Sequence, residues 1–341
     1  MGLLDLAPVN PASPAESRCG RLAPLRAYLA LGKPRLNTLV LATTLVGYLL
    51  ATTAALDWYH LVATLAGTAL AAFGANALNE CIEADRDARM RRTCQRPLPA
   101  MRIAVRPALA VALTAGFCGV LLLAVRINVL AALLAAAAVL IYVLVYTPLK
   151  TRTPLCTLAG AVVGAIPPMI GWAAATGRID LGAWLLAGIL FLWQIPHALA
   201  LAWLHRDDYE RAGFRMLPCA DPGGRLTCRA ITVHALMLLP LGLAMALVGV
   251  AGSTYAIGSL LLGLGLIGPV LSLQRACSGP GARRVFVATV TYLPVLLGLM
   301  LLDRHPVRYR AEQRVDHSAD TQRAFPLANA RPAVFAEGHT P

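Results

Sequence analysis

Long apolar stretches, separated by shorter polar ones, recur along almost the whole chain. Nine of them are long enough to cross a bilayer as helices, which takes about 20 apolar residues each. They lie at 36–56, 61–79, 107–125, 128–147, 155–175, 181–203, 231–251, 254–273 and 285–302. A segment in lipid must satisfy its own backbone hydrogen bonds, so these stretches are predicted to be helices rather than strands. The pattern predicts an all-α polytopic membrane protein with about nine transmembrane helices.

The composition supports this fold class. Of the 341 residues, 58% are hydrophobic and 14% are charged, and the mean hydropathy is +0.65. A soluble domain carries about 25% charged residues and needs that polar surface to cover its core. A soluble enzyme and a disordered chain are therefore excluded. Only the ends, 1–25 and 304–341, are polar and turn-rich, so we expect disordered termini around a membrane domain at 26–303.

The net charge of +13 reports orientation in the membrane rather than a nucleic-acid partner. If the N-terminus lies inside, the inside segments hold 22 lysines and arginines, the outside loops hold two, and the C-terminal tail holds six. An excess of basic residues marks the cytoplasmic side. We therefore expect the N-terminus and the larger polar loops in the cytoplasm, the C-terminus on the opposite side, and no binding of nucleic acid.

Eight cysteines are scattered along the chain without a recognisable framework. No two have the C-x-x-C spacing of a zinc or redox motif. We interpret them as small core residues or loop thiols and expect no structural zinc site. They are Cys19, Cys81, Cys94, Cys118, Cys156, Cys219, Cys228 and Cys277.

Two inside loops, 80–106 and 204–230, hold eight of the 17 acidic residues and are also the most basic. Charge alone would describe a solvated loop equally well. Asn79, Glu83 and Asp87, however, follow at intervals of four and share one face of a continuing helix. Three oxygen ligands on one face suit Mg²⁺. Several arginines follow in the same stretch, and Mg²⁺ beside arginines suits a diphosphate.

Polar residues at or near membrane depth form a second group of candidates. Trp193-Gln194-Ile195-Pro196-His197 lies within the sixth apolar stretch. An ionisable residue there indicates function, so His197 either contacts a ligand or hydrogen-bonds a neighbouring helix. Lys150 closes the fourth stretch at the inside face, as a membrane-surface anchor or as a phosphate contact. Lys33, just before the first stretch, leaves the same two alternatives open.

Taken together, these residues resemble the UbiA-type intramembrane prenyltransferases over roughly 25–303. The M-x-R-T-x-x-R-P-L ending of the first loop and the W-Q-x-P-H block favour the branch that farnesylates heme over those that prenylate a quinone precursor or a chlorin. The matching segments are Asn79 to Thr93 followed by Arg96-Pro97-Leu98-Pro99, Lys33-Pro34-Arg35, Tyr146-Thr147-Pro148-Leu149-Lys150, Gly164-Ala165-Ile166-Pro167-Pro168 with Gly171-Trp172, Trp193 to His197, Asp208-Tyr209-Glu210-Arg211-Ala212-Gly213, Met216-Leu217-Pro218, Ala282-Arg283-Arg284 and Tyr292-Leu293-Pro294.

The resemblance implies nine helices around a central cavity that the polar loops cap on the cytoplasmic side. It implies a Mg²⁺-dependent enzyme of the bacterial inner membrane, which transfers the farnesyl group of farnesyl diphosphate to a vinyl group of heme b. Water is added, heme O and diphosphate are the products, and heme A synthase or terminal oxidase assembly would receive the heme. A membrane transporter, with its broken helices and midplane polar groups, is the alternative from another class, and a non-catalytic assembly factor is a third.

The same resemblance implies roles for individual residues. Asn79, Glu83 and Asp87 would hold Mg²⁺ on the diphosphate, and Asp208 would hold a second Mg²⁺ from the other loop. The phosphate oxygens would be bound by Lys33, Arg92, Arg96 and Lys150, and the heme would contact His197 and Trp193.

Overall fold

The computed structural model describes residues 23–53 and 55–305, and this part of the chain is almost entirely helical. The termini expected to be disordered lie outside it, except for residues 23–25 and 304–305. The elements are α1 (Ala23–Leu31), α2 (Pro34–Ala51), α3 (Trp58–Asp87), α4 (Val105–Arg126), α5 (Val129–Leu140), a π-helical turn η1 (Ile141–Tyr146), α6 (Thr147–Leu149), α7 (Cys156–Thr176), α8 (Leu181–Leu204), α9 (Arg206–Arg211), α10 (Leu217–Ala220), α11 (Arg225–Leu247), α12 (Ser253–Ala276) and α13 (Gly279–Leu302).

Each of the nine predicted spans corresponds to a helix of the structure. In the described residues, eight helical stretches are long and apolar enough to cross a membrane, with η1 and α6 continuing α5 as one span. The remaining predicted span, the first in the chain, is α2. It has 18 residues and begins with Pro34-Arg35-Leu36-Asn37, so its apolar part is short. Within the sixth span, α8 stays helical through Pro196, because transmembrane helices tolerate proline where neighbouring groups satisfy the backbone.

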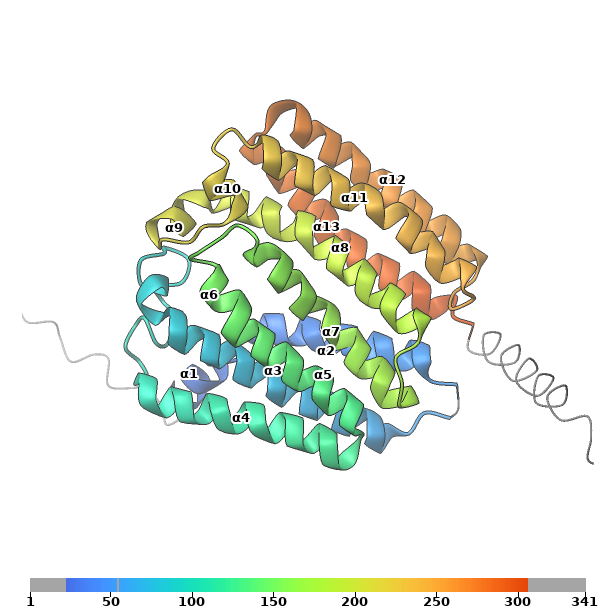
Figure 1. Ribbon diagram of the computed structural model, residues 1–341, viewed down its shortest axis with the longest axis horizontal. Helices are drawn as coiled ribbons and strands as arrows, with labels where there is room; N and C mark the ends of the chain where they lie inside the picture. The colour runs from blue at the N-terminus through green and yellow to red at the C-terminus, as the bar shows by residue number, and fades with distance from the viewer. Residues whose placement is uncertain (1–22, 54, 306–341) are drawn as a thin grey trace, which may run out of the picture.

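The long helices pack side by side, and the polar loops gather at one end of the bundle, on the left in Figure 1. α2 packs on α7, α3 on α4, and α8 on α7, α11 and α13. More than half of the most apolar part of α3, α7 and α8 is buried, against less than a third for α4, α5, α11 and α12. α3, α7 and α8 therefore form the interior, and α4, α5, α11 and α12 present apolar side chains to the lipid.

Glycines allow α2 and α7 to approach backbone to backbone. A Cβ atom added at Gly171 of α7 would overlap the carbonyl oxygen of Thr44, and one added at Gly47 of α2 would overlap that of Pro168. Helices in lipid associate through close packing of small residues rather than through the hydrophobic effect. This contact fixes α2 against α7. It also fixes the position of Lys33, which directly precedes α2.

We expect Gly171→Ala to destabilise the bundle by about 1–3 kcal/mol or more, because the added methyl group must push α2 away from α7. Thermal unfolding of the purified protein in detergent measures this effect. Gly265→Ala is the matched control, since Gly265 lies in α12 with no atom within 4 Å of a Cβ placed there. That variant should match the parent or gain up to about 1 kcal/mol. Equal melting of both variants would contradict the packing argument.

Candidate active site

The polar end of α3 carries the first predicted motif. α3 begins after Asp57, whose side chain accepts a hydrogen bond from the His60 amide, and continues to Asp87, well past the apolar stretch. Asn79, Glu83 and Asp87 therefore lie on one helical face, as their spacing predicts. All three side chains are buried. A buried acidic side chain needs partners or its charge is too costly.

Each of these three side chains is bonded to a cationic residue from a different part of the chain. Lys33 precedes α2, Arg96 lies in the loop after α3, and Lys150 follows α6. We call the six residues the α3 cluster. Its contacts are Lys33 Nζ to Asn79 Oδ1 (2.6 Å), Lys150 Nζ to Glu83 Oε2 (2.8 Å) and Arg96 Nη1 to Asp87 Oδ2 (2.6 Å).

The chain has only two lysines, and both belong to the α3 cluster. Lys33 has φ 49° and ψ 67°, a left-handed conformation that is strained for a residue with a side chain. Burial, followed by repulsion from Arg96 and Lys150, lowers the pKa of Lys33 to about 7. The choice of lysine over arginine in so arginine-rich a chain marks both positions as sites for a compact point charge.

Lys150 connects the two polar loops. Its ammonium group lies 4.7 Å from the ring centre of Tyr146 and 5.5 Å from that of Phe214, and its carbonyl oxygen accepts a hydrogen bond from the Arg215 amide (2.7 Å). Burial lowers the pKa of Lys150, but the Glu83 carboxylate and nearby tyrosines outweigh it, so the net shift of the pKa is upward. The Glu83 carboxylate therefore favours the charged form of the Lys150 side chain.

The sequence did not single out Thr147, which holds Asn79 from the other side. Asn79 Nδ2 donates to Thr147 Oγ1 (3.0 Å), and that hydroxyl donates to the Tyr142 carbonyl oxygen (2.8 Å). Thr147 follows the π-helical turn η1, and such turns are frequent at functional sites. It belongs to the Tyr146-to-Lys150 segment quoted above, but no rule of spacing indicated that η1 would present it to α3.

Buried carboxylate oxygens remain without a hydrogen bond beside these contacts. They are Glu83 Oε1 and both oxygens of Glu80. A divalent cation would satisfy such atoms, and the donor set of carboxylates and one amide oxygen is that of Mg²⁺. Within the described part of the chain, no three His, Cys, Asp or Glu side chains form a ready-made metal site. The carboxylate and amide oxygens on this face of α3 fit a Mg²⁺ whose other ligands are phosphate oxygens or water.

The second polar loop meets the first over Tyr209. Arg92 Nη2 donates to the Tyr209 hydroxyl (2.8 Å), and its guanidinium lies 5.3 Å from the centre of that ring. Asp208, on α9, forms an ion pair with Arg211. Burial, then the positive charge of Arg92, lowers the pKa of His205, and Asp208 partly opposes this shift.

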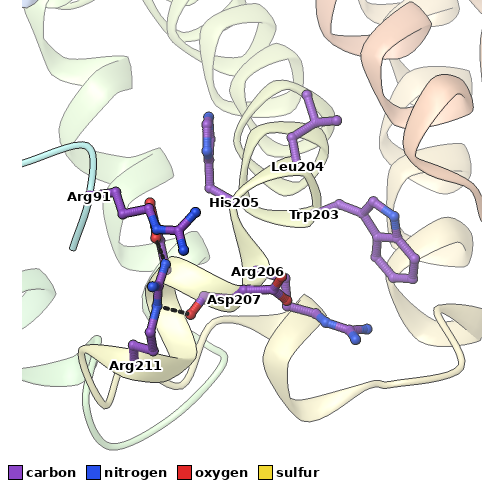
Figure 2. Close-up of a pocket in the computed structure, with 8 residues that line it drawn as sticks. Arg91, Trp203, Leu204, His205, Arg206, Asp207 and Arg211 are labelled. Atoms are coloured by element: carbon purple, nitrogen blue, oxygen red, sulfur yellow. Dashed lines mark hydrogen bonds and ion pairs between the residues drawn. The ribbon is translucent and has the colours of Figure 1, made fainter. Parts of the chain in front are cut away.

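A pocket of 410 Å³ lies where the two loops meet. In Figure 2, Arg91 stands on one side of it and Trp203 on the other. No hydrogen bond or ion pair in the described residues joins Arg92 or Asp208 directly to the carboxylates of α3. The structure thus brings six of the predicted residues into one cluster and places Asp208 at this pocket, with Arg92 in the loop contact beside it. The lining residues are Arg91, Trp203, Leu204, His205, Arg206, Asp207, Asp208 and Arg211.

Trp193 and His197 lie one turn apart on α8 and face α13. Trp193 Nε1 donates to the carbonyl oxygen of Thr289 (2.7 Å), and His197 Nδ1 is 3.0 Å from the Thr289 hydroxyl. The imidazole is stacked between the rings of Trp193 and Phe286, with centre distances of 5.0 and 4.8 Å. Of the two alternatives that the sequence left open for His197, the structure contains the hydrogen bond to a neighbouring helix.

Known proteins are similar to this chain in sequence and in fold. The model of the UbiA prenyltransferase family matches residues 40–301. A protoheme IX farnesyltransferase of Solibacter usitatus (strain Ellin6076) is 41% identical over 291 residues, which cover 82% of this chain and 99% of that protein.

Two solved structures have the same fold. One describes a digeranylgeranylglyceryl phosphate synthase, with a TM-score of 0.71 and 16% identity over 82% of this chain and 98% of that one. The other is a UbiA homologue from Archaeoglobus fulgidus bound to DMAPP and Mg²⁺, with a TM-score of 0.59 and 16% identity over 80% of this chain and 99% of that one. Matched by the family model along 40–301 and by a relative that aligns over nearly its whole length, this chain belongs to the UbiA prenyltransferase family.

Proposed function

We propose that this protein transfers the farnesyl group of farnesyl diphosphate to a vinyl group of heme b, with addition of water, and releases heme O and diphosphate. The close relatives named protoheme IX farnesyltransferase support the reaction. One structural observation carries the assignment of the site: three buried oxygen-bearing side chains on one face of α3, each bonded to a cation from elsewhere in the chain. A diphosphate with Mg²⁺ needs both kinds of group within reach.

The cations of the α3 cluster would bind the phosphate oxygens. Lys33, Arg96 and Lys150 are held close to the site by their present contacts with Asn79, Asp87 and Glu83, so little reorientation is needed to reach a diphosphate. As the allylic C–O bond breaks, negative charge grows on the leaving diphosphate. Positive groups fixed in place stabilise that charge more in a water-poor site than they would in bulk water.

Asn79, Glu83 and Asp87 would hold Mg²⁺, as the unpaired oxygen of Glu83 suggests. The structure of the Archaeoglobus fulgidus homologue, which contains DMAPP and Mg²⁺, supports the metal. When bound, Mg²⁺ supplies positive charge to the diphosphate. Asp208 would hold a second Mg²⁺ from the other loop. Arg92, fixed against Tyr209, would bind a phosphate oxygen there.

The apolar bundle would keep bulk water from the allylic carbon. If water captured the farnesyl cation before the cation reached the heme, the product would be an alcohol. Exclusion of water prevents this side reaction. The vinyl group of heme b then attacks the farnesyl carbon, and one water molecule adds to the resulting cation with loss of a proton.

His197 and Trp193 would contact the heme from α8. We expect His197→Ala to raise the KM for heme about 10-fold, with no change in the KM for farnesyl diphosphate, because the α3 cluster is untouched. Steady-state turnover with each substrate varied in turn measures this. Thr289→Val, which removes the hydroxyl bonded to His197 but leaves the imidazole in place, is the matched control and should have the smaller effect. An equal rise in both KM values would contradict the assignment.

The protein is an integral membrane protein. We propose that it lies in the bacterial inner membrane with the N-terminus and the polar loops in the cytoplasm and the C-terminus on the opposite side. The concentration of basic residues in the loops that surround the α3 cluster supports this orientation. Heme A synthase or the assembly of a terminal oxidase would receive the product.

The direct test is turnover in purified membranes given heme b, farnesyl diphosphate and Mg²⁺, with the extracted heme analysed by mass spectrometry. The expected product is a hydroxyethylfarnesyl heme that no longer forms when EDTA removes the metal. Unchanged heme b, with a prenylated quinone precursor in a parallel sample, would mean that the protein is a prenyltransferase of this fold whose acceptor is a quinone precursor and not heme b. No transfer to either acceptor from folded protein would favour a transporter or an assembly factor instead.

A further inference from the structure

Two cysteines from different helices meet at the polar end of the bundle. Cys228 lies in the first turn of α11, and Cys277 ends α12, 49 residues later. Their Sγ atoms are 2.9 Å apart. This is closer than an ordinary van der Waals contact and less than 1 Å from the bonded distance of about 2.05 Å. In the described residues no other two cysteine sulfurs are in hydrogen-bonding contact.

The backbone at Cys277 is strained, and its conformation brings the Cys277 thiol next to that of Cys228. Cys277 has φ 35° and ψ 46°, the left-handed conformation that glycine or asparagine usually supplies at the end of a helix. Its amide donates to the Leu273 carbonyl oxygen (2.7 Å), which holds this turn. A strained conformation at a residue with a side chain often marks a functional position.

The two thiols differ in access. Cys228 is buried, whereas Cys277 is partly exposed. Gly224 lies next to both Trp203 and Cys277, since a Cβ added there would overlap the Trp203 ring and come within 3.1 Å of Cβ of Cys277. Trp203 lines the pocket shown in Figure 2. The cysteine pair therefore adjoins one residue of the pocket lining.

We propose that Cys228 and Cys277 form a dithiol site that a low-molecular-weight disulfide oxidises to an intramolecular disulfide. The accessible Cys277 thiolate attacks one sulfur of the external disulfide, and a mixed disulfide forms as one thiol leaves. The Cys228 thiolate then attacks Sγ of Cys277, the protein disulfide forms, and the second thiol leaves. Both protons pass to the two released thiols, so the protein is oxidised by two electrons and the external disulfide is reduced by two.

The pair lies at the end of the bundle that carries the polar loops. In the orientation proposed above this end faces the cytoplasm, where disulfides are transient and redox-sensing rather than permanent. The site is therefore a reversible one, which a reducing thiol returns to the dithiol form. The thiol–disulfide exchange itself uses no residue of the α3 cluster.

The test treats the full-length protein with glutathione disulfide, alkylates the remaining thiols, and maps peptides by mass spectrometry. The wild type should contain a Cys228–Cys277 cross-linked peptide about 2 Da lighter than the sum of the two reduced peptides, and dithiothreitol should cleave it. Cys228→Ser cannot resolve the mixed disulfide and should gain about 305 Da of glutathione at Cys277. Cys277→Ser should show neither product at Cys228.

Cys118→Ser is the matched control, since Cys118 is an exposed residue of α4 that bonds no other cysteine of the described chain, and it should behave like the wild type. Full alkylation of both Cys228 and Cys277 in the wild type after oxidation would overturn the proposal. A cross-link from Cys277 to a different cysteine would also overturn it. The wild-type measurement uses no substitution, so it decides the matter even where a variant folds poorly.

Discussion

Asp87→Asn is expected to lower turnover of farnesyl diphosphate and heme b about 100- to 1,000-fold while the protein remains folded. The change removes one negative charge from the face of α3 that would hold Mg²⁺. The amide has almost the same shape as the carboxylate, and its oxygen can still accept the hydrogen bond from Arg96. The loss should therefore appear in the chemical step more than in stability. Initial rates with saturating substrates, together with thermal unfolding, separate the two.

Asp85→Asn is the matched control for this variant. Asp85 lies on the same turn of α3, but its side chain is exposed and points away from the face shared by Asn79, Glu83 and Asp87. The same chemical change there should alter turnover less than about threefold, as surface substitutions usually do. If both variants lose activity equally, the loss reflects the charge of the loop rather than a ligand. Normal turnover by Asp87→Asn would exclude Asp87 as a metal ligand.

The helices could be predicted from the sequence because the bilayer imposes a length and a composition on each span. The face shared by Asn79, Glu83 and Asp87 could be predicted as well, since it depends only on the helical period. The prediction required α3 to continue beyond its apolar part, and α3 does continue to Asp87. Those predictions needed no information about which helices are neighbours.

The partners of these residues could not be predicted in the same way. Arg96 was expected to bind phosphate, yet its present contact is Asp87, nine residues earlier in the chain. Thr147 bonds Asn79 directly after η1, where the helical period departs from that of an α-helix. Cys228 and Cys277 meet only because α11 packs on α12. Each of these contacts depends on tertiary packing, and spacing along the sequence carries no record of it.

A signal for the two lysines was nevertheless present in the composition. Lysine and arginine serve equally well as basic residues facing the cytoplasm, and this chain uses arginine at every basic position except Lys33 and Lys150. Arginine holds a planar group that binds two oxygens in a fixed geometry, whereas lysine places a small charge that can exchange between partners. The two exceptions support the proposal that the charge at these positions passes from a carboxylate or amide to a phosphate.

Lys150→Met should lower turnover about 100-fold and should also destabilise the protein. Methionine fills the space of the lysine side chain without its charge, so Glu83 is left as a buried carboxylate without its ion pair. Breaking a buried pair from one side costs about 3–5 kcal/mol. The contacts of the ammonium group with Tyr146 and Phe214 are lost as well, which weakens the link between the polar loops.

The double variant Glu83→Gln/Lys150→Met separates the two effects, because it removes the unpaired charge together with its partner. Its thermal unfolding should return most of the way to that of the parent, since replacing both members of a buried pair costs far less than removing one. Its turnover should stay as low as that of Lys150→Met or fall further, because a phosphate contact and a metal ligand are then both absent. Recovery of activity along with stability would mean that Lys150 serves the fold alone. Recovery of stability without recovery of activity would mean that the lost turnover does not result from the unpaired buried charge.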